Sequence, residues 1–217
     1  MKYAIYDFDG TLLQTQTVPF ILRHWQASSL PKKFYKKVKN IIIFRYILMK
    51  LKIFGIRYDD FRYWAMGQVG RLFGTITIDQ LSQFLDDLFL ASKSLLHKKI
   101  VKQISKDKQD GFHTVLLSGN FDVFLERYRV LGFDDILGTQ LFDQHAKVMN
   151  PIRMLSADQK VSSLLKAIPS IQWDKTKAFS DSYADIELLN QVKEAICVTP
   201  DKKLFKVARE NHWRIIF

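Results

Sequence analysis

The sequence predicts an α/β fold, a doubly wound parallel sheet covered by helices, with a separate helical segment inserted into it. Two observations lead to this prediction. From residue 111 onward, short runs typical of strands alternate with amphipathic helical segments, which is the pattern of repeated βαβ units. Between residues 16 and 91 the chain instead shows long stretches with helical periodicity. We therefore expect a core domain of residues 1–15 and 92–217 and an α-helical cap domain of residues 16–91.

The first element is a short apolar run, residues 2–8, which we expect to be a buried strand of the sheet. Helices follow it, and proline and glycine mark their limits. Pro31 opens one helix, and Gly55 and Gly74 interrupt the helical pattern. The expected helices cover residues 17–29, 31–53, 58–73, 78–91 and 92–109. The last of these returns the chain to the sheet.

The C-terminal part supplies the remaining strands and the helices between them. The expected strands are 113–118, 136–141, 176–180, 194–199 and 213–217, of which 136–141 could instead be the arm of a hairpin. The expected helices are 121–131, 156–167, 183–192 and 201–211. The helix at 156–167 begins with Ser-Ala-Asp-Gln, which is a capping pattern. Because the strands of such a sheet run parallel, their carboxyl ends share one edge, and ligands bind there.

Composition excludes a disordered, fibrous or membrane-spanning protein. The chain has 217 residues and is 47% hydrophobic and 13% aromatic, which is enough for a full apolar core. No segment approaches the roughly 18 apolar residues of a membrane span. The single cysteine, Cys197, lies in an apolar run and cannot form a disulfide within the chain. We expect a cytoplasmic protein, because the first residues show a strand pattern and no secretory signal.

The net charge of +11 is placed unevenly. Positions 10–58 contain ten Lys or Arg residues and no Asp or Glu. Residues 32–57 alternate basic and bulky apolar side chains, and two interpretations remain open. The simpler one is a cap helix with a solvated basic face. The other is peripheral contact with the inner membrane surface, where the basic surface attracts an anionic phospholipid. Nucleic acid is a less favoured partner, because the sequence contains no recognisable nucleic-acid-binding motif beside the basic residues.

Polar residues follow several of the expected strands. They are Asp7, Asp9, Ser118, Gly119, Asn120, Asp181 and Asp185, and Lys160 lies near the start of a helix. Carboxylates crowded together stay ionised only around a cation, and oxygen ligands suit Mg²⁺. A hydroxyl, free backbone N–H groups and a lysine suit a phosphate. Metal, phosphate and a spare carboxylate together indicate phosphoryl transfer.

Four stretches, in order, resemble the motifs of the haloacid dehalogenase-like hydrolases. They are Asp7-Phe8-Asp9-Gly10-Thr11-Leu12, Leu117-Ser118-Gly119, Lys160 and Ser180-Asp181-Ser182-Tyr183-Ala184-Asp185. The resemblance covers the whole chain and implies the Rossmann-like core of that superfamily. The position of the cap, together with the Ser-Gly-Asn-Phe and Asp-Gln-Lys-Val stretches, resembles subfamily IB. The C-terminal run from Val198 to Leu204 narrows this to the phosphoserine phosphatase-like and phosphatidylglycerophosphatase C-like branch.

The resemblance implies a Mg²⁺-dependent phosphatase that acts through an aspartyl-phosphate. Asp7 would be the nucleophile and a metal ligand. Asp9 would be the general acid and base, and its backbone carbonyl would bind Mg²⁺. Asp181 would be the third metal ligand. Asp185 would also belong to the metal site, in the outer coordination shell of the ion.

The resemblance also implies how substrate is held. Ser118, Gly119 and Asn120 would bind phosphate oxygens, and Lys160 would balance the negative charge. The substrate would be a small metabolite phosphate or a phospholipid phosphate. Phosphoserine phosphatases have an acid at the position of Gln16, which argues against phosphoserine itself.

Two other functions fit the same sequence. A phosphotransferase would use the same first two acids, Asp7 and Asp9. A weakly active binding protein would keep the fold and dock on an anionic membrane or on nucleic acid through the basic cap. The intact acids favour the enzyme.

Overall fold

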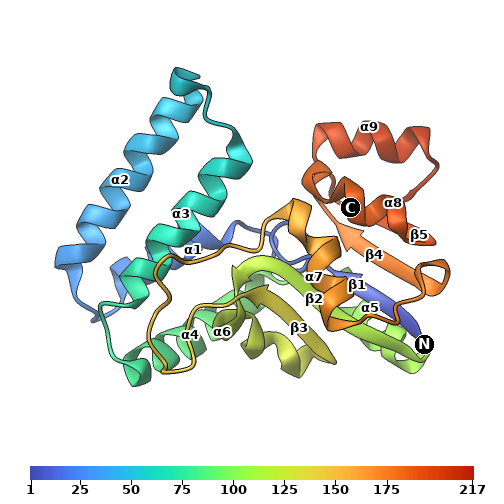
Figure 1. Ribbon diagram of the computed structural model, residues 1–217, viewed down its shortest axis with the longest axis horizontal. Coiled ribbons are helices and arrows are strands. Elements are labelled where there is room, and N and C mark those ends of the chain that lie inside the picture. Colours follow the sequence, from blue (N-terminus) through green and yellow to red (C-terminus); the bar gives the residue numbers. More distant parts are fainter.

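The computed structural model describes residues 1–217, and its six strands form one parallel sheet in the order β3-β2-β1-β4-β5-β6 (Figure 1). The strands are β1 (Lys2–Tyr6), β2 (Phe112–Phe121), β3 (Asp135–Thr139), β4 (Thr176–Ser180), β5 (Glu194–Val198) and β6 (Arg214–Ile216). β1 lies inside the sheet and pairs in parallel with both β2 and β4. The predicted α/β fold with a doubly wound parallel sheet is therefore confirmed.

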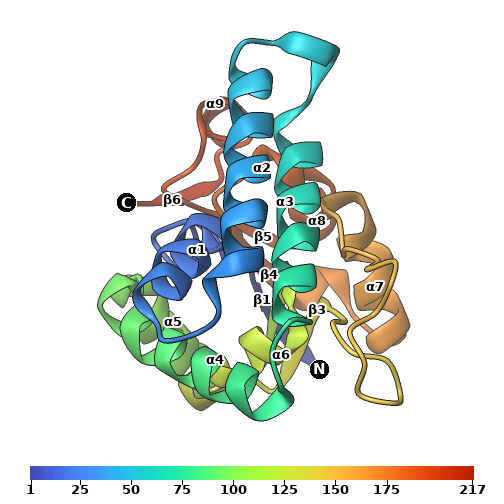
Figure 2. The same ribbon diagram turned by 90° about the vertical axis from the view of Figure 1, so that its left-hand side faces the viewer.

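Four α-helices lie between β1 and α5 (Lys98–Gln109), in the part of the chain where the insertion is predicted. They are α1 (Thr17–Ala27), α2 (Lys32–Lys50), α3 (Tyr58–Phe73) and α4 (Ile78–Ser92). α2 and α3 form a pair that projects beyond the sheet, with residues 51–57 at its end (Figures 1 and 2). One continuous apolar core joins these helices to the sheet, so the cap limits at residues 16 and 91 stay a prediction. No helix combines the length and apolar character needed to span a bilayer.

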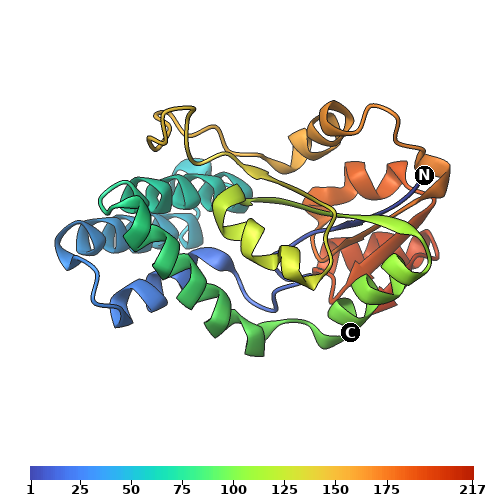
Figure 3. The same ribbon diagram turned by 90° about the horizontal axis from the view of Figure 1, so that it is seen from below.

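Side chains of β1 alternate between the two faces of the sheet. Ala4 and Tyr6 belong to the core on one face, and Tyr3 and Ile5 belong to the core on the other. The first face is covered by α5, and the second by α7 (Lys160–Ala167), α8 (Ile186–Gln191) and α9 (Lys202–Glu210). Figure 3 shows α5, in green, and α7, in orange, on opposite sides of the strands. Burial on both faces explains why β1 is apolar almost throughout.

Element ends differ from the predicted ones for local reasons. α2 ends at Lys50 and not at residue 53, because Lys52 and Phe54 adopt left-handed backbone conformations, with φ of 56° and 62°. The helix predicted at 92–109 is divided, since Leu96 pairs with Leu13 in an extended bridge before α5 begins.

Two segments near the second motif also differ. β2 continues beyond Ser118 to Phe121, where it pairs with Thr139 of β3. The helix predicted at 121–131 is shorter, with α6 (Asp122–Leu125) followed by a 3₁₀ turn over Glu126–Leu131. The second motif therefore lies within a strand and not after one.

A buried ion pair joins α5 to the sheet. Asp107 is fully buried, and its Oδ1 accepts hydrogen bonds from Lys177 Nζ and Gln103 Nε2, both at 2.6 Å. Its Oδ2 accepts a hydrogen bond from the Tyr6 hydroxyl. Lys177 Nζ also lies 3.9 Å from the centroid of the Phe112 ring. The two charges thus satisfy each other where α5, β1, β2 and β4 meet.

Candidate active site

A cavity of about 640 Å³ lies at the carboxyl ends of β1 and β2 and beside the start of α7. Seven of the eight residues singled out in the sequence line it: Asp7, Asp9, Ser118, Gly119, Asn120, Lys160 and Asp185. The eighth, Asp181, does not line the cavity, and its carboxylate lies against Gly10. Residues from four separate parts of the chain therefore meet at one place.

A tight loop after β1 positions the first two acids. The N–H of Asp7 still bonds to the carbonyl of Phe179 in β4, at 2.9 Å. The chain then turns, and the carbonyl of Phe8 accepts the N–H groups of Leu12 and Leu13. Gly10 completes the turn with φ of 78°, a left-handed conformation that favours glycine. This loop directs the side chains of Asp7 and Asp9 into the same cavity.

Lys160 bridges two carboxylates. Its Nζ donates to Asp7 Oδ1 at 2.7 Å and to Asp185 Oδ2 at 2.8 Å, and all three side chains are buried. Lys160 is the first residue of α7, and a capping box between Ser156 and Gln159 fixes the turn before it. Burial lowers the pKa of Lys160, but Asp185 and Asp7 raise it above its usual range. The lysine therefore stays a cation.

Asp185 faces Lys160 and the end of β4. Its carboxylate also accepts a hydrogen bond from Ser180 Oγ at 2.7 Å. Both of its oxygens lie within bonding distance of Lys160 Nζ. Asp185 is thus placed to hold Lys160 in position, and its role in the outer shell of a metal ion stays a prediction.

Asp9 is held by the inserted helices. Its Oδ1 accepts hydrogen bonds from the N–H of Thr17, at 3.0 Å, and from the hydroxyl of Thr17, the first residue of α1. Arg62 of α3 brings Nη2 to 3.8 Å from Asp9 Oδ2. Burial raises the pKa of Asp9 more than Arg62 and Thr17 lower it. A carboxyl that keeps its proton more readily suits a general acid.

An irregularity in β2 shapes the second motif. The register against β3 shifts between Leu117 and Phe121, and such bulges redirect side chains near functional sites. Ser118 Oγ accepts hydrogen bonds from the N–H and the Nδ2 of Asn120, both at 3.2 Å. A Cβ on Gly119 would lie 2.8 Å from the carbonyl oxygen of Leu155. The close approach of these two backbones therefore requires glycine there.

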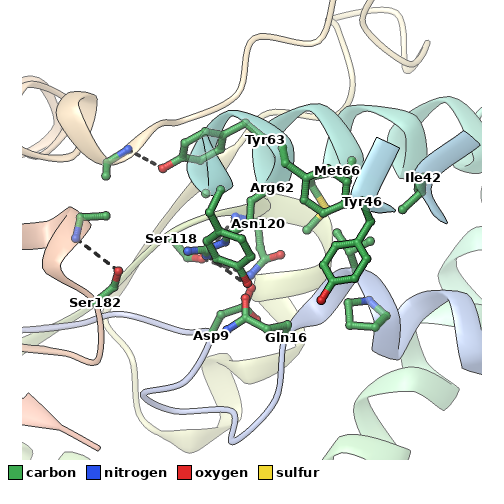
Figure 4. Close-up of a pocket in the computed structure, with 18 of the residues that line it drawn as sticks. Asp9, Gln16, Ile42, Tyr46, Arg62, Tyr63, Met66, Ser118, Asn120 and Ser182 are labelled. Carbon is green, nitrogen blue, oxygen red and sulfur yellow. Dashed lines mark hydrogen bonds and ion pairs between the residues drawn. The ribbon is translucent and has the colours of Figure 1, made fainter. Parts of the chain in front are cut away.

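The rest of the cavity wall is largely apolar and comes from the inserted helices. Its apolar side chains are Val18, Pro19, Leu22, Ile42, Ile43, Phe61, Ala65 and Met66, with Tyr46 and Tyr58 beside them. Figure 4 shows Ile42, Tyr46 and Met66 on one side, and Asp9 and Ser118 away from them. The cavity thus has a polar floor and an apolar wall.

Three residues at this site were not predicted from the sequence, namely Thr17, Arg62 and Tyr63. Tyr63 connects α3 to the turn before Lys160, because its hydroxyl accepts the N–H of Ala157 at 2.6 Å. Thr17 could have been noticed as the first residue of a helix close behind Asp9. Arg62 and Tyr63 have no distinguishing spacing among the many basic and aromatic residues of the insertion.

The acids fit a Mg²⁺ ion held by few protein ligands. No three Asp, Glu, His or Cys side chains in the structure are arranged to enclose a metal ion, but Mg²⁺ usually takes one or two carboxylates with waters and substrate phosphate. Burial and then the charge of Asp7 raise the pKa of Asp181 to about 8. Burial raises the pKa of Asp7 to about 6, although Lys160 lowers it. Neighbouring carboxylates with raised pKa values fit a cation between them.

Replacing Gly10 with alanine is expected to lower activity about 10²-fold, because a misplacement of about 1 Å in a site has this effect. The new Cβ would lie 2.0 Å from Asp181 Oδ2, so the Asp181 side chain must move. Phosphate release measures the loss. Gly111→Ala is the matched control, since Gly111 has φ of 76° and open space around it. Equal activity of the two variants would contradict the proposed place of Asp181.

The model of the haloacid dehalogenase-like hydrolase family matches residues 4–190, a range that includes all four motif stretches. The chain belongs to the haloacid dehalogenase-like hydrolases. No curated protein matches the sequence of this hydrolase at a significant level.

Solved structures share the fold of this hydrolase over nearly its whole length. A protein of unknown function from Bordetella pertussis Tohama I has a TM-score of 0.79 at 17% identity, covering 99% of this chain and 97% of that one. A phosphoserine phosphohydrolase-like protein from Francisella tularensis subsp. tularensis SCHU S4 has a TM-score of 0.63 at 18% identity, covering 99% and 94%. A substrate-bound phosphoserine phosphatase complex has a TM-score of 0.61 at 17% identity, covering 99% and 92%. At these identities the likeness shows the fold.

Proposed function

We propose that this hydrolase is a Mg²⁺-dependent phosphatase that cleaves a phosphate monoester through an aspartyl-phosphate on Asp7. The observation that supports it is the floor of the cavity, where Asp7 contacts the buried cation Lys160 and lies beside Asp9 and Ser118. A carboxylate next to a fixed cation and a second acid with a raised pKa are the groups that a nucleophilic displacement at phosphorus needs.

In the first step, a carboxylate oxygen of Asp7 attacks phosphorus and the bond to the ester oxygen breaks. Asp9 gives its proton to that leaving oxygen. In the second step, water attacks the phosphorus of the aspartyl-phosphate, Asp9 takes a proton from the water, and inorganic phosphate leaves. Asp7 is then free again, and the protonated Asp9 is ready for the next ester.

The remaining residues hold the phosphoryl group and the metal. The Ser118 hydroxyl and the N–H groups of Gly119 and Asn120 would donate to phosphate oxygens. Lys160, oriented by Asp185, would balance the charge of the phosphate. Mg²⁺, held by Asp7, Asp181 and the carbonyl of Asp9, would supply further neutralisation of that charge.

The lining of the cavity supports a proposal about the group that carries the phosphate. Gln16 lines the cavity and is neutral, so it offers no negative charge to pair with the ammonium group of phosphoserine. The apolar wall favours a substituent with apolar surface. We therefore propose a small metabolite phosphate or a phospholipid phosphate as substrate. The buried thiol of Cys197 fits the reducing cytoplasm, which we propose as the location.

The test is phosphate release from a chromogenic aryl phosphate with Mg²⁺, followed by a panel of soluble and lipid phosphates. We expect EDTA to reduce turnover to background and added Mg²⁺ to restore it, because the buried acids need a cation. Thermal unfolding with and without EDTA separates loss of chemistry from loss of fold. Undiminished turnover in EDTA would contradict the metal dependence, and inactivity on the whole panel would contradict the proposed phosphatase.

A further inference from the structure

α2 and the segment that follows it expose an unusual number of large apolar side chains. Ten of the 17 exposed large hydrophobic residues of the chain lie within residues 32–58. We call Phe44, Ile47, Leu51, Ile53 and Phe54 the α2 tip. Phe54 is 83% exposed, and Leu51 and Phe44 are more than half exposed. Phe44, Ile47 and Leu51 follow one another at helical spacing and so share one face. Large exposed apolar patches mark interaction sites.

The backbone holds this surface outward. The α2–α3 pair projects from the rest of the molecule, with residues 51–57 at its end (Figures 1 and 2). Phe54 has φ of 62°, which a bulky residue rarely adopts. The residue is 83% exposed, so its ring makes little contact within the protein that would offset this strain. Strained residues cluster at functional positions such as ligand clamps.

Charge selects the kind of partner. Residues 32–57 contain nine Lys or Arg residues and no Asp or Glu. A second copy of the chain would bring the same positive charge against it, which is unfavourable. An anionic bilayer can bind both kinds of side chain. Its negative headgroups attract the lysines, and the boundary of its acyl chains accepts the apolar side chains.

The entrance of the catalytic cavity borders the α2 tip. Ile43, Tyr46 and Lys50 are exposed and also line the cavity. On the helix they alternate with Ile47 and Leu51 of the tip, within one turn of each other. A surface that contacts the tip would therefore lie beside the opening that leads to Asp7 and Asp9.

We propose that the α2 tip inserts into the interface of an anionic bilayer and so presents the cavity to phosphate monoesters carried by lipids. The docking depends only on the exposed surface. The choice of a lipid substrate rests on the proposed phosphatase function.

Vesicle flotation of the full chain tests the docking. We expect the protein to float with vesicles of phosphatidylcholine and phosphatidylglycerol, to stay behind with phosphatidylcholine alone, and to detach as salt rises. The double variant Leu51→Ser, Phe54→Ser should lose at least about tenfold in binding. Val130→Ser is the matched control, because Val130 is 77% exposed on a different part of the molecule.

A charge-reversed pair tests the electrostatic part. Lys52→Glu with Arg57→Glu, both exposed beside the α2 tip, should weaken flotation, whereas Lys102→Glu with Lys106→Glu on α5 should leave it unchanged. Equal binding to neutral vesicles, or flotation unaffected by the tip variants, would overturn the proposal. A third result would also overturn it. In that result the tip variants abolish a concentration-dependent dimer, or a complex with RNA, but leave vesicle binding unchanged.

Activity assays separate this proposal from the proposed function. The tip variants should turn over a soluble aryl phosphate like the wild type, but release less phosphate from phosphatidic acid in vesicles. Flotation of a protein that is inert on every phosphate would support docking and refute the phosphatase. Turnover of the aryl phosphate without flotation would support the phosphatase and refute docking.

Discussion

The Asp7→Asn variant is expected to lose phosphate release by at least about 10⁴-fold and to keep its fold, since removal of a nucleophile has effects of this size. An amide cannot form the aspartyl-phosphate. The amide matches the carboxylate in shape. The substitution also removes one of two buried acids whose pKa is raised by burial, so it relieves a buried negative charge. We therefore expect an unfolding temperature close to that of the wild type, measured by circular dichroism alongside phosphate release.

Asp9→Asn gives a sharper control for the same step. Loss of a general acid and base lowers turnover by about 10²–10⁴-fold. Because an aryl phosphate has a good leaving group, this variant should still form the aspartyl-phosphate and then fail to hydrolyse it. Intact-mass spectrometry should detect one added phosphoryl group on Asp9→Asn and none on Asp7→Asn. Turnover of Asp7→Asn within tenfold of an exposed-acid control, Asp174→Asn, would refute the assignment of the nucleophile.

The second large effect concerns stability. Asp107→Ala should lower the free energy of unfolding by about 3–5 kcal/mol, because it leaves a buried charge without its partner. Lys177 Nζ lies 2.6 Å from the Asp107 carboxylate and is nearly buried, so it cannot turn to water. Urea unfolding measures the change. Asp110→Ala, an exposed acid at the end of the same helix, should change stability little.

A double variant tests whether the pairing is the cause. Asp107→Leu with Lys177→Met removes both charges and fills the space with apolar groups of similar size. Replacement of a buried pair in this way is often neutral or stabilising. We expect the double variant to be more stable than Asp107→Ala, and a double variant as unstable as the single one would show that packing, and not the unpaired charge, causes the loss.

Much of the fold and of the candidate site followed from local patterns. Strand and helix signals of the C-terminal half are short-range, and the rule that parallel strands share one carboxyl edge brings Asp7 and Ser118 together without further information. The motif resemblance then supported Lys160, whose only local signal is its place near the start of a helix. The shared cavity is consistent with this reasoning from strand ends.

The remainder depends on contacts between distant parts of the chain. Arg62 and Tyr63 reach the site only because α3 packs over the sheet edge, a placement that no short pattern encodes. Asp107 lies in a lysine-rich helix, so the sequence suggests an acid exposed to solvent. In the structure it is buried and paired with Lys177 of β4. The early end of α2 follows from left-handed residues that the sequence does not require.

The anchoring of Asp9 by Thr17 limits how this hydrolase can be re-engineered. A chimaera that exchanges the whole helical insertion for that of a relative would be joined most simply at residue 16, where the two domains are expected to divide. Such a graft would discard the N–H and hydroxyl that orient Asp9. A working exchange must therefore retain Thr17, or import a residue that offers the same two donors.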